Sequence, residues 1–192
     1  MYGHTYPVFD VAWSPDGQTL ASCGDTIRLW DPGTGETIRE LIGHEGTVYS
    51  LAWSPDGRTM YHADTPTLTV RAFAYDVATG TPSMPRNFAQ WTGETDRPDG
   101  GAVDSAGNYW TAFYRGGKVL QVSPAGVTLA EYPIPAMCPT MCAFGGPDLR
   151  TLYVTSARQM REDEELARLP FSGGIFTMRV DIPGLPEPHF AG

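Results

Sequence analysis

Two identical pentapeptides, separated by 40 residues, constrain the fold of this chain more than any other feature. Trp-Ser-Pro-Asp-Gly occurs at residues 13–17 and again at 53–57, and a Gly-His pair recurs with the same spacing at 3–4 and 43–44. Sequence motifs that recur in the same order at a constant spacing indicate a structural repeat. Each pentapeptide joins an aromatic residue typical of strands to a turn that needs glycine at a positive φ. The sequence therefore predicts β-rich repeats of about 40 residues.

The first repeat contains four short segments with the composition of strands. Apolar and aromatic residues alternate in 8–14, and turn residues separate this segment from 19–22, 26–31 and 36–42. Four strands in about forty residues are one blade of a β-propeller.

Alignment of the first strands extends this pattern along the whole chain. The aligned core positions are Trp13, Trp53, Val103 and Phe144, and they place the starts of four blades near residues 7, 47, 98 and 140. The 22 glycines and 17 prolines fit short strands joined by tight turns. The predicted fold class is all-β: one β-propeller domain over 1–192 with four four-stranded blades, as a half-ring or part of a larger ring.

Charge and cysteine content exclude several classes of partner. The net charge of -9 argues against binding to nucleic acid or to an anionic membrane surface. The sequence shows neither a signal peptide nor an 18-residue apolar run, which predicts a cytoplasmic protein without a membrane partner. Three cysteines fit a reducing compartment. Cys138 and Cys142 have no second Cys/His pair nearby, so buried thiols are favoured over metal ligands.

The first blade resembles a WD repeat over about residues 3–57. Gly-His, an Asp in the second turn and a closing Trp-Asp occur there in the order of that family. The resemblance implies a hydrogen-bonded structural network of His4, Ser22, Asp25 and Trp30. A blade of this kind carries no chemistry of its own, so it implies a structural element or a protein-binding platform.

The remainder, about residues 47–192, resembles the senescence-marker-protein/regucalcin/gluconolactonase family. The words that carry this resemblance are Arg97-Pro-Asp-Gly100, Gly116-Gly-Lys-Val119, Pro139-Thr-Met-Cys-Ala-Phe-Gly-Gly146, Leu152-Tyr-Val-Thr-Ser-Ala-Arg158 and Gly173-Gly-Ile-Phe176. The resemblance implies six-bladed propellers that hold a divalent metal, calcium or zinc, on the axis and hydrolyse sugar lactones. The predicted organisation is a chimera with a WD-repeat-like blade at 1–46 and three gluconolactonase-like blades at 47–192.

Candidate site residues open the innermost strands, because the axis of a propeller collects side chains from several blades. Four residues before each aligned core position stand Phe9, Tyr49, Asp99 and Thr140, which are expected to line the axis. The resemblance implies that Asp99 is a metal ligand and a catalytic proton-transfer residue. In the family, a metal-binding Asn stands at the position of Tyr49. The third metal ligand of the family is a Glu in its N-terminal half, for which this sequence shows no counterpart.

The predicted metal site is incomplete. A Ca²⁺ ion takes about six to eight oxygen ligands, and a Tyr phenol stays protonated at neutral pH. The prediction is a metal-dependent sugar-lactone hydrolase lineage with weak or no activity. The alternative is a non-catalytic chimeric propeller scaffold or a protein-binding module of the WD-repeat type.

Two further expectations concern a loop and the assembly. The acidic run at 162–165 is expected to be a solvated loop, with a gate over the axial site as the alternative. Blades shaped for rings of six or seven span about 205° to 240° when there are four of them. A two-fold, eight-bladed homodimer is therefore expected, with an open half-ring as the alternative.

Overall fold

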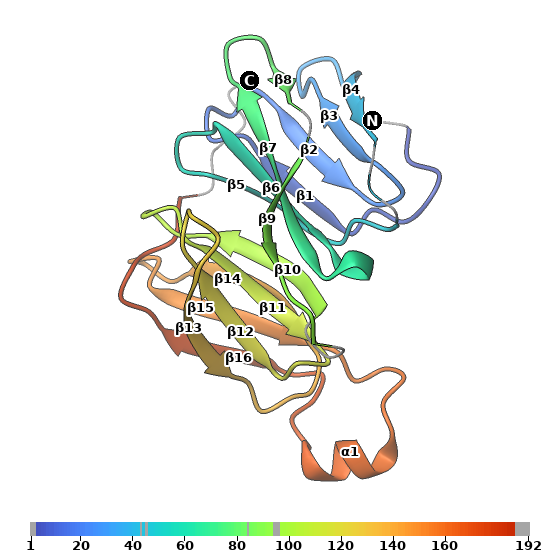
Figure 1. Cartoon of the computed structure of the whole chain (residues 1–192), viewed down its shortest axis with the longest axis vertical. Coiled ribbons are helices and arrows are strands. Elements are labelled where there is room, and N and C mark those ends of the chain that lie inside the picture. The colour runs from blue at the N-terminus through green and yellow to red at the C-terminus, as the bar shows by residue number, and fades with distance from the viewer. Residues whose placement is uncertain (1–2, 43, 45, 84, 94–96, 187–192) are drawn as a thin grey trace. The chain divides into compact units, whose positions relative to one another are not determined.

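The computed structural model describes residues 3–42, 44, 46–83, 85–93 and 97–186 (Figure 1). The chain divides into two compact units, residues 1–90 with 186–192 and residues 91–185. Each unit contains two antiparallel sheets, which confirms the all-β prediction. Helix is limited in the described ranges to the 3-10 turn η1 (Thr65–Thr67) and the short α1 (Asp163–Arg168).

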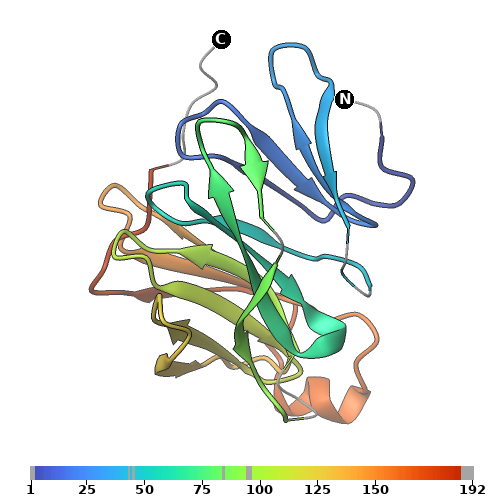
Figure 2. The same cartoon turned by 45° about the horizontal axis from the view of Figure 1, so that its top comes forward.

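The first sheet is a four-stranded meander in which all neighbours are consecutive in sequence (Figure 2). Its strands are β1 (Asp10–Trp13), β2 (Leu20–Cys23), β3 (Ile27–Trp30) and β4 (Thr37–Leu41). β1, β3 and β4 lie inside the segments predicted from the sequence, and β2 extends one residue beyond its predicted segment. The turn after β1 has Gly17 at φ 69°, and the Asp16 carboxylate accepts a hydrogen bond from the Gln18 amide at 3.1 Å. The repeated pentapeptide is therefore a strand end followed by a turn that requires glycine.

The second sheet belongs to the same unit and has a divided outer strand. It runs from β5 (Leu51–Trp53) through β6 (Thr59–Asp64) to β7 (Thr69–Asp76), which pairs with both β8 (Thr81–Pro82) and β9 (Arg86–Gln90). The predicted fourth strand of this blade is thus present as two short pieces. The two sheets share one core, which includes Cys23, Ile27, Leu29, Val48, Trp53, Met60 and Phe73. Complete burial of an aliphatic side chain contributes about 1.5–3 kcal/mol.

The second unit contains the third and fourth sheets. The third consists of β10 (Arg97–Val103), β11 (Tyr109–Tyr114), β12 (Lys118–Val122) and β13 (Thr128–Pro133). The fourth has three strands within the described ranges: β14 (Pro139–Gly145), β15 (Thr151–Ser156) and β16 (Ile175–Arg179). The four sheets begin with β1, β5, β10 and β14, close to the predicted starts, so each sheet is a propeller blade.

The hydrogen-bond network expected in the first blade is present. His4 Nδ1 lies 2.7 Å from Asp25 Oδ1 and His4 Nε2 lies 2.7 Å from Ser22 Oγ, while Trp30 Nε1–H donates to Ser22 Oγ at 2.7 Å. Asp25 also accepts a bond from the Thr5 hydroxyl at 2.6 Å. Hydrogen bonds from Thr5 and His4 hold the pKa of Asp25 well below its usual range. The polar side-chain atoms of this network are therefore occupied by hydrogen bonds that stabilise the blade.

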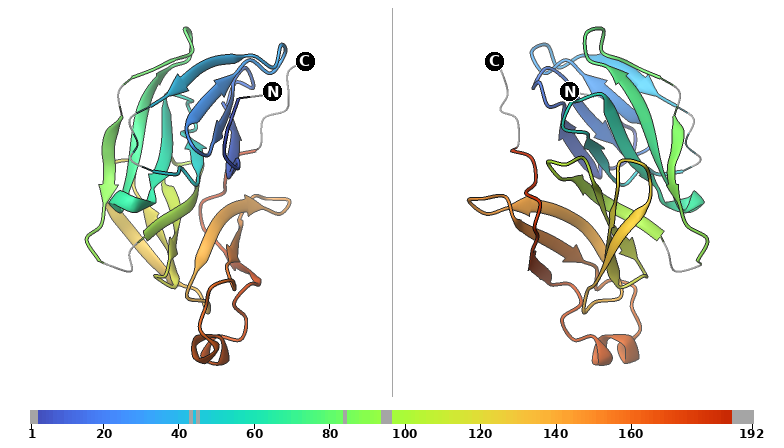
Figure 3. Two further views of the ribbon diagram at one scale, coloured as in Figure 1. Left: turned by 90° about the vertical axis from the view of Figure 1, so that its right-hand side faces the viewer. Right: turned by 60° about the vertical axis from the view of Figure 1, so that its left-hand side comes forward.

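The acidic run at 162–165 was predicted to be a solvated loop; residues 162–164 are exposed, but the run is helical from Asp163 and Glu165 is buried. Residues from Asp163 onward form α1, on the connection between β15 and β16 (Figure 3). Glu165 is buried and forms an ion pair with Arg161, which precedes α1 by two residues. The guanidinium therefore neutralises the buried carboxylate.

The cysteine prediction is confirmed, since Cys23, Cys138 and Cys142 are all buried free thiols. Burial raises the pKa of Cys142 to about 12. Within the described ranges, no helix combines the length and apolar character that crossing a bilayer requires.

Candidate active site

Asp99 lies at an irregularity in β10, the first strand of the third sheet. Arg97 and Pro98 pair with Tyr114 and Phe113, and the register then shifts so that Gly101 pairs with Thr111. Asp99 and Gly100 occupy this β-bulge. A bulge bends the strand and re-aims the side chain that it carries.

Thr140 occupies the corresponding place in β14, the first strand of the fourth sheet. The register of β14 with β15 shifts between Pro139 and Met141, so Thr140 is the bulged residue. Its Oγ1 lies 2.8 Å from Oγ1 of Thr155. Both axis positions predicted in this unit therefore lie at bulges of opening strands.

Gly100 allows β10 and β14 to approach each other closely. A Cβ atom at residue 100 would lie 2.5 Å from the carbonyl oxygen of Thr140 and 2.5 Å from Met141 Sδ. A larger residue would push the strands apart, so glycine is required by the close backbone approach. Asp99 is thereby held beside the strand that carries Thr140.

The carboxyl group of Asp99 has an unusual electrostatic environment. The side chain is partly buried, and within the described ranges no cationic side chain forms an ion pair with it. Burial raises its pKa from 3.8 to about 7, because desolvation disfavours the charged form. A carboxyl group with this pKa is close to half-ionised at neutral pH and can both take up and release a proton.

Tyr114 and Arg161 were not singled out in the sequence. Tyr114 ends β11, and its pKa is raised by burial and by the neighbouring Cys138 and Asp99, against the opposing charge of Arg161. Arg161 Nε donates to Glu165 Oε1 at 2.8 Å, and a second bond joins Arg161 Nη2 to Glu165 Oε2. The one sequence signal for Tyr114 is its position at the end of the strand that pairs with the Asp99 strand.

The other two predicted axis residues belong to the first unit. Phe9 precedes β1 and is 44% exposed, and Tyr49 precedes β5. Their ring centroids are 4.9 Å apart with the planes tilted by 55°. This distance and tilt are typical of a favourable aromatic pair.

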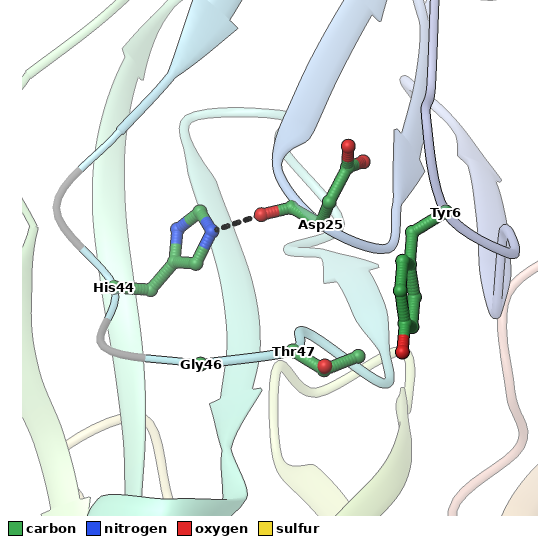
Figure 4. A pocket seen from close by; sticks show the side chains of 5 residues that line it. All are labelled: Tyr6, Asp25, His44, Gly46 and Thr47. Atoms are coloured by element: carbon green, nitrogen blue, oxygen red, sulfur yellow. Dashed lines mark hydrogen bonds between the residues drawn. The ribbon is translucent and has the colours of Figure 1, made fainter.

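A shallow hollow of about 390 Å³ also lies in the first unit (Figure 4). Its lining residues are Tyr6, Asp25, His44, Gly46 and Thr47. His44 Nε2 is 3.0 Å from the backbone oxygen of Asp25. The carboxylate of Asp25 is already bonded to His4 and Thr5, so among the described lining residues no carboxylate is free for catalysis.

The donor set around Asp99 does not fit a divalent metal site. Among the described residues, no three His, Cys, Asp or Glu side chains group together as metal ligands would. Asp99 brings one carboxylate and the neighbouring Thr140 and Thr155 bring hydroxyls, whereas Ca²⁺ takes six to eight oxygen ligands. The described residues near the bulge thus supply one carboxylate and two hydroxyl groups.

Antiparallel sheets of the blade type and a carboxyl group in a strand bulge define a β-propeller protein with a candidate hydrolytic site. The profile described as the SMP-30/Gluconolactonase/LRE-like region matches residues 16–158. The chain therefore belongs to the SMP-30/gluconolactonase/LRE-like family.

Individual relatives agree with this assignment. The chain is 51% identical to 6-deoxy-6-sulfogluconolactonase of Pseudomonas putida over 134 residues, 69% of this chain and 45% of the relative. It is 36% identical to regucalcin of Homo sapiens over 69% of this chain and 45% of the relative. A solved structure of a calcium-binding protein, regucalcin, from Agrobacterium tumefaciens aligns with a TM-score of 0.83 and 28% identity. That alignment covers 95% of this chain and 64% of the solved chain.

The extent of the family match changes one prediction. The match begins at residue 16 and therefore includes most of the blade that was assigned to a WD-repeat type. Membership of the WD-repeat family is not shown, although its expected hydrogen-bond network is present. The boundary near residue 47 stays a prediction. The chain spans about half the length of the curated relatives it matches.

Proposed function

We propose that this chain is a sugar-lactone hydrolase in which Asp99 acts as the general base. The observation that carries the proposal is the placement of one carboxyl group, with its pKa raised to about 7, at a strand bulge inside the family-matched region. A general base is most effective when its pKa lies near the operating pH. The relative with 51% identity is named for a sugar lactone, which supports this substrate class.

The reaction follows from the chemistry of a carboxylate beside hydroxyl groups. Ionised Asp99 takes a proton from water, and the resulting hydroxide adds to the lactone carbonyl carbon to form a tetrahedral intermediate. Collapse of the intermediate breaks the bond to the ring oxygen, which takes up the proton that Asp99 removed from water, and gives the open-chain hydroxy acid. The Thr140 and Thr155 hydroxyls, 2.8 Å apart, can orient the water or a sugar hydroxyl beside Asp99.

Weak activity is part of the proposal. A divalent ion would polarise the lactone carbonyl and acidify bound water, but Asp99 with two threonine hydroxyls supplies too few ligands. Asp99 as a metal ligand thus remains an implication of the family, and calcium or zinc binding by this chain is expected to be poor. The Asn that the resemblance implies is replaced by Tyr49, whose phenol is a weak ligand.

The test compares initial rates of D-glucono-1,5-lactone hydrolysis for the wild type and two variants, measured with a pH indicator and corrected for the uncatalysed reaction. Asp99→Asn is expected to lose about 100-fold or more in kcat, as removal of a general base does. Asp148→Asn is the control, because this exposed carboxylate pairs with Arg179 on the surface. Equal rates for wild type and Asp99→Asn would refute the assignment.

A second candidate is a non-catalytic scaffold or protein-binding module. It is favoured by the aromatic pair of Phe9 and Tyr49 and by the fully engaged network around His4 and Asp25. If the wild type hydrolyses none of a panel of sugar lactones faster than the uncatalysed rate, the non-catalytic function is preferred over the hydrolase function.

A further inference from the structure

The second sheet of the first unit carries a histidine where the first sheet carries a serine. The repeated tryptophans Trp13 and Trp53 pair with the residues two positions before Ser22 on β2 and before His62 on β6. In the first sheet, the Ser22 hydroxyl lies 2.7 Å from His4 Nε2 and belongs to the structural network of that blade. The second sheet therefore has an imidazole, which can take up a proton near neutral pH, in place of a hydroxyl group, which cannot.

The imidazole of His62 is enclosed and contacts two other rings. Only 1% of the residue is exposed. Its ring stacks on Phe73 of β7 with centroids 5.6 Å apart, and the ring of His44 meets it edge-on with centroids 6.3 Å apart. His62 Nδ1 is buried and has no hydrogen-bond partner within the described ranges. Because both ring nitrogens are donors in the protonated form, protonation would leave a buried N–H group without an acceptor.

The charged groups on the neighbouring strands also disfavour a positive charge on His62. Arg71 of β7 pairs directly with His62, and its guanidinium lies 3.1 Å from a carboxylate oxygen of Asp64. The buried carboxylate of Asp64 is thus already matched by one cation. On the other side, Leu51 of β5 pairs with His62, and its amide donates to the Asp10 carboxylate at 2.9 Å. No carboxylate of these strands is therefore left over to balance a protonated imidazole.

His44 lies between this enclosed ring and the surface of the first unit. It is half-buried, it lines the shallow hollow, and its Nε2 lies 3.0 Å from the backbone oxygen of Asp25 (Figure 4). The carboxylate of Asp25 accepts hydrogen bonds from His4 and Thr5, so it is engaged elsewhere. Separation of the His44 and His62 rings is therefore a route by which solvent can reach the buried imidazole.

We propose that His62 is an acid-sensing residue that loosens the first unit as the pH falls below the ordinary titration range of histidine. The ring takes up a proton only in states in which its contacts with His44 and Phe73 have opened, so acid increases the population of those states. The inference concerns the first unit alone and does not rest on the proposed hydrolase function, whose base Asp99 belongs to the second unit.

The direction and size of the effect follow from the linkage between proton binding and folding. Burial, together with the charges of His44 and Arg71, lowers the pKa of His62 from 6.5 to about 3. The unfolded chain therefore binds this proton more tightly than the folded chain does. The stability that neutral His62 contributes is fully present above pH 6.5 and is lost as the pH falls towards 3. Between pH 7.5 and pH 4.5, this residue is expected to raise the equilibrium constant of unfolding about 100-fold.

The experiment is urea unfolding of the full chain at pH 7.5 and pH 4.5, followed by tryptophan fluorescence. The ratio of the unfolding constants at the two pH values is expected to be about 100-fold smaller in His62→Gln than in the wild type. Comparison of the two proteins cancels the contribution of other titrating groups, including Asp99. His44→Gln is the matched control, because it removes the neighbouring imidazole and leaves His62 in place. It is expected to keep at least about a tenfold advantage over His62→Gln in this ratio.

A measurement on the wild type keeps the test valid if His62→Gln does not fold, as judged by circular dichroism. Imidazole proton NMR signals are followed from pH 7.5 to pH 5, and the signal of His62 is assigned through its contact with the Phe73 ring. This signal is expected to stay unshifted in the folded chain. A shift of the His62 signal with an ordinary histidine pKa overturns the inference. A pH dependence of unfolding that is equal in His62→Gln and the wild type, or that His44→Gln alone removes, overturns it as well.

Discussion

Replacement of Asp99 by Asn keeps the shape of the side chain and removes its charge at every pH. In the wild type, burial raises the pKa of this carboxyl group from 3.8 to about 7. The folded protein therefore binds the proton more tightly than the unfolded chain does. The stability that protonated Asp99 contributes is fully present below pH 3.8 and is lost as the pH rises through 7.

The size of this effect follows from the two pKa values. One pKa unit corresponds to about 1.36 kcal/mol, so the rise from 3.8 to about 7 corresponds to about 4 kcal/mol. Because proton binding is linked to folding, the raised pKa lowers the wild-type free energy of unfolding as the pH rises. Relative to acidic pH, where Asp99 is protonated in both states, the loss is about 2 kcal/mol at pH 5 and about 4 kcal/mol at pH 8. Asn pays no such cost, so Asp99→Asn is expected to be more stable than the wild type, and increasingly so at higher pH.

Urea unfolding at pH 5 and pH 8, followed by tryptophan fluorescence, measures the difference. The free energy of unfolding of Asp99→Asn relative to wild type is expected to rise by about 2 kcal/mol between the two pH values. Asp181→Asn, at an exposed position, is the control for the loss of one surface carboxylate. If the stability difference between Asp99→Asn and the wild type is the same at both pH values, the pKa of Asp99 is not raised by burial and the reasoning is refuted.

Three further predictions concern the first unit, metal binding and assembly. Trp30→Phe removes the 2.7 Å bond to Ser22 and is expected to cost about 1–3 kcal/mol in urea unfolding; a cost below about 0.5 kcal/mol would mean that the network is not stabilising. Calorimetry with CaCl₂ is expected to show only weak binding, improved at most slightly by Tyr49→Asn, and a sub-micromolar dissociation constant would contradict the incomplete site. We propose that the chain forms a homodimer that covers exposed apolar side chains of the first sheet, such as Val11 and Ile38, which are 58% and 48% exposed. Light scattering is then expected to give twice the 20.9 kDa chain mass, and Val11→Lys to lower it, whereas a monomeric wild type would contradict the dimer.

The sequence was most informative where local chemistry determines the structure. The repeated pentapeptide predicted the ends of β1 and β5, because proline, aspartate and glycine have a defined geometry in tight turns. Apolar patterning and turn residues placed all four strands of the first blade within one or two residues of their observed bounds. The network of His4 and Trp30 followed from a family resemblance, and its geometry is as expected.

The parts of the site that were missed depend on contacts that sequence spacing does not reveal. Asp99 and Thr140 were expected to line an axis, but the bulges that hold them are a matter of strand register. Tyr114 lies opposite Arg97, 17 positions earlier in the chain, through the pairing of β10 with β11. The acidic run is exposed at 162–164 as predicted, but the burial of Glu165 depends on its ion pair with Arg161 and on a short helix that was not predicted.

The most direct test of the central claim is the pH dependence of kcat/KM for gluconolactone hydrolysis by the wild type between pH 5 and pH 8. The profile of kcat/KM reports the pKa of the essential base in the free enzyme. The account predicts an ascending limb with an apparent pKa near 7, which is the raised pKa of Asp99, and its disappearance in Asp99→Asn. An ascending limb near pH 4, or one that persists in Asp99→Asn, would contradict Asp99 as the base.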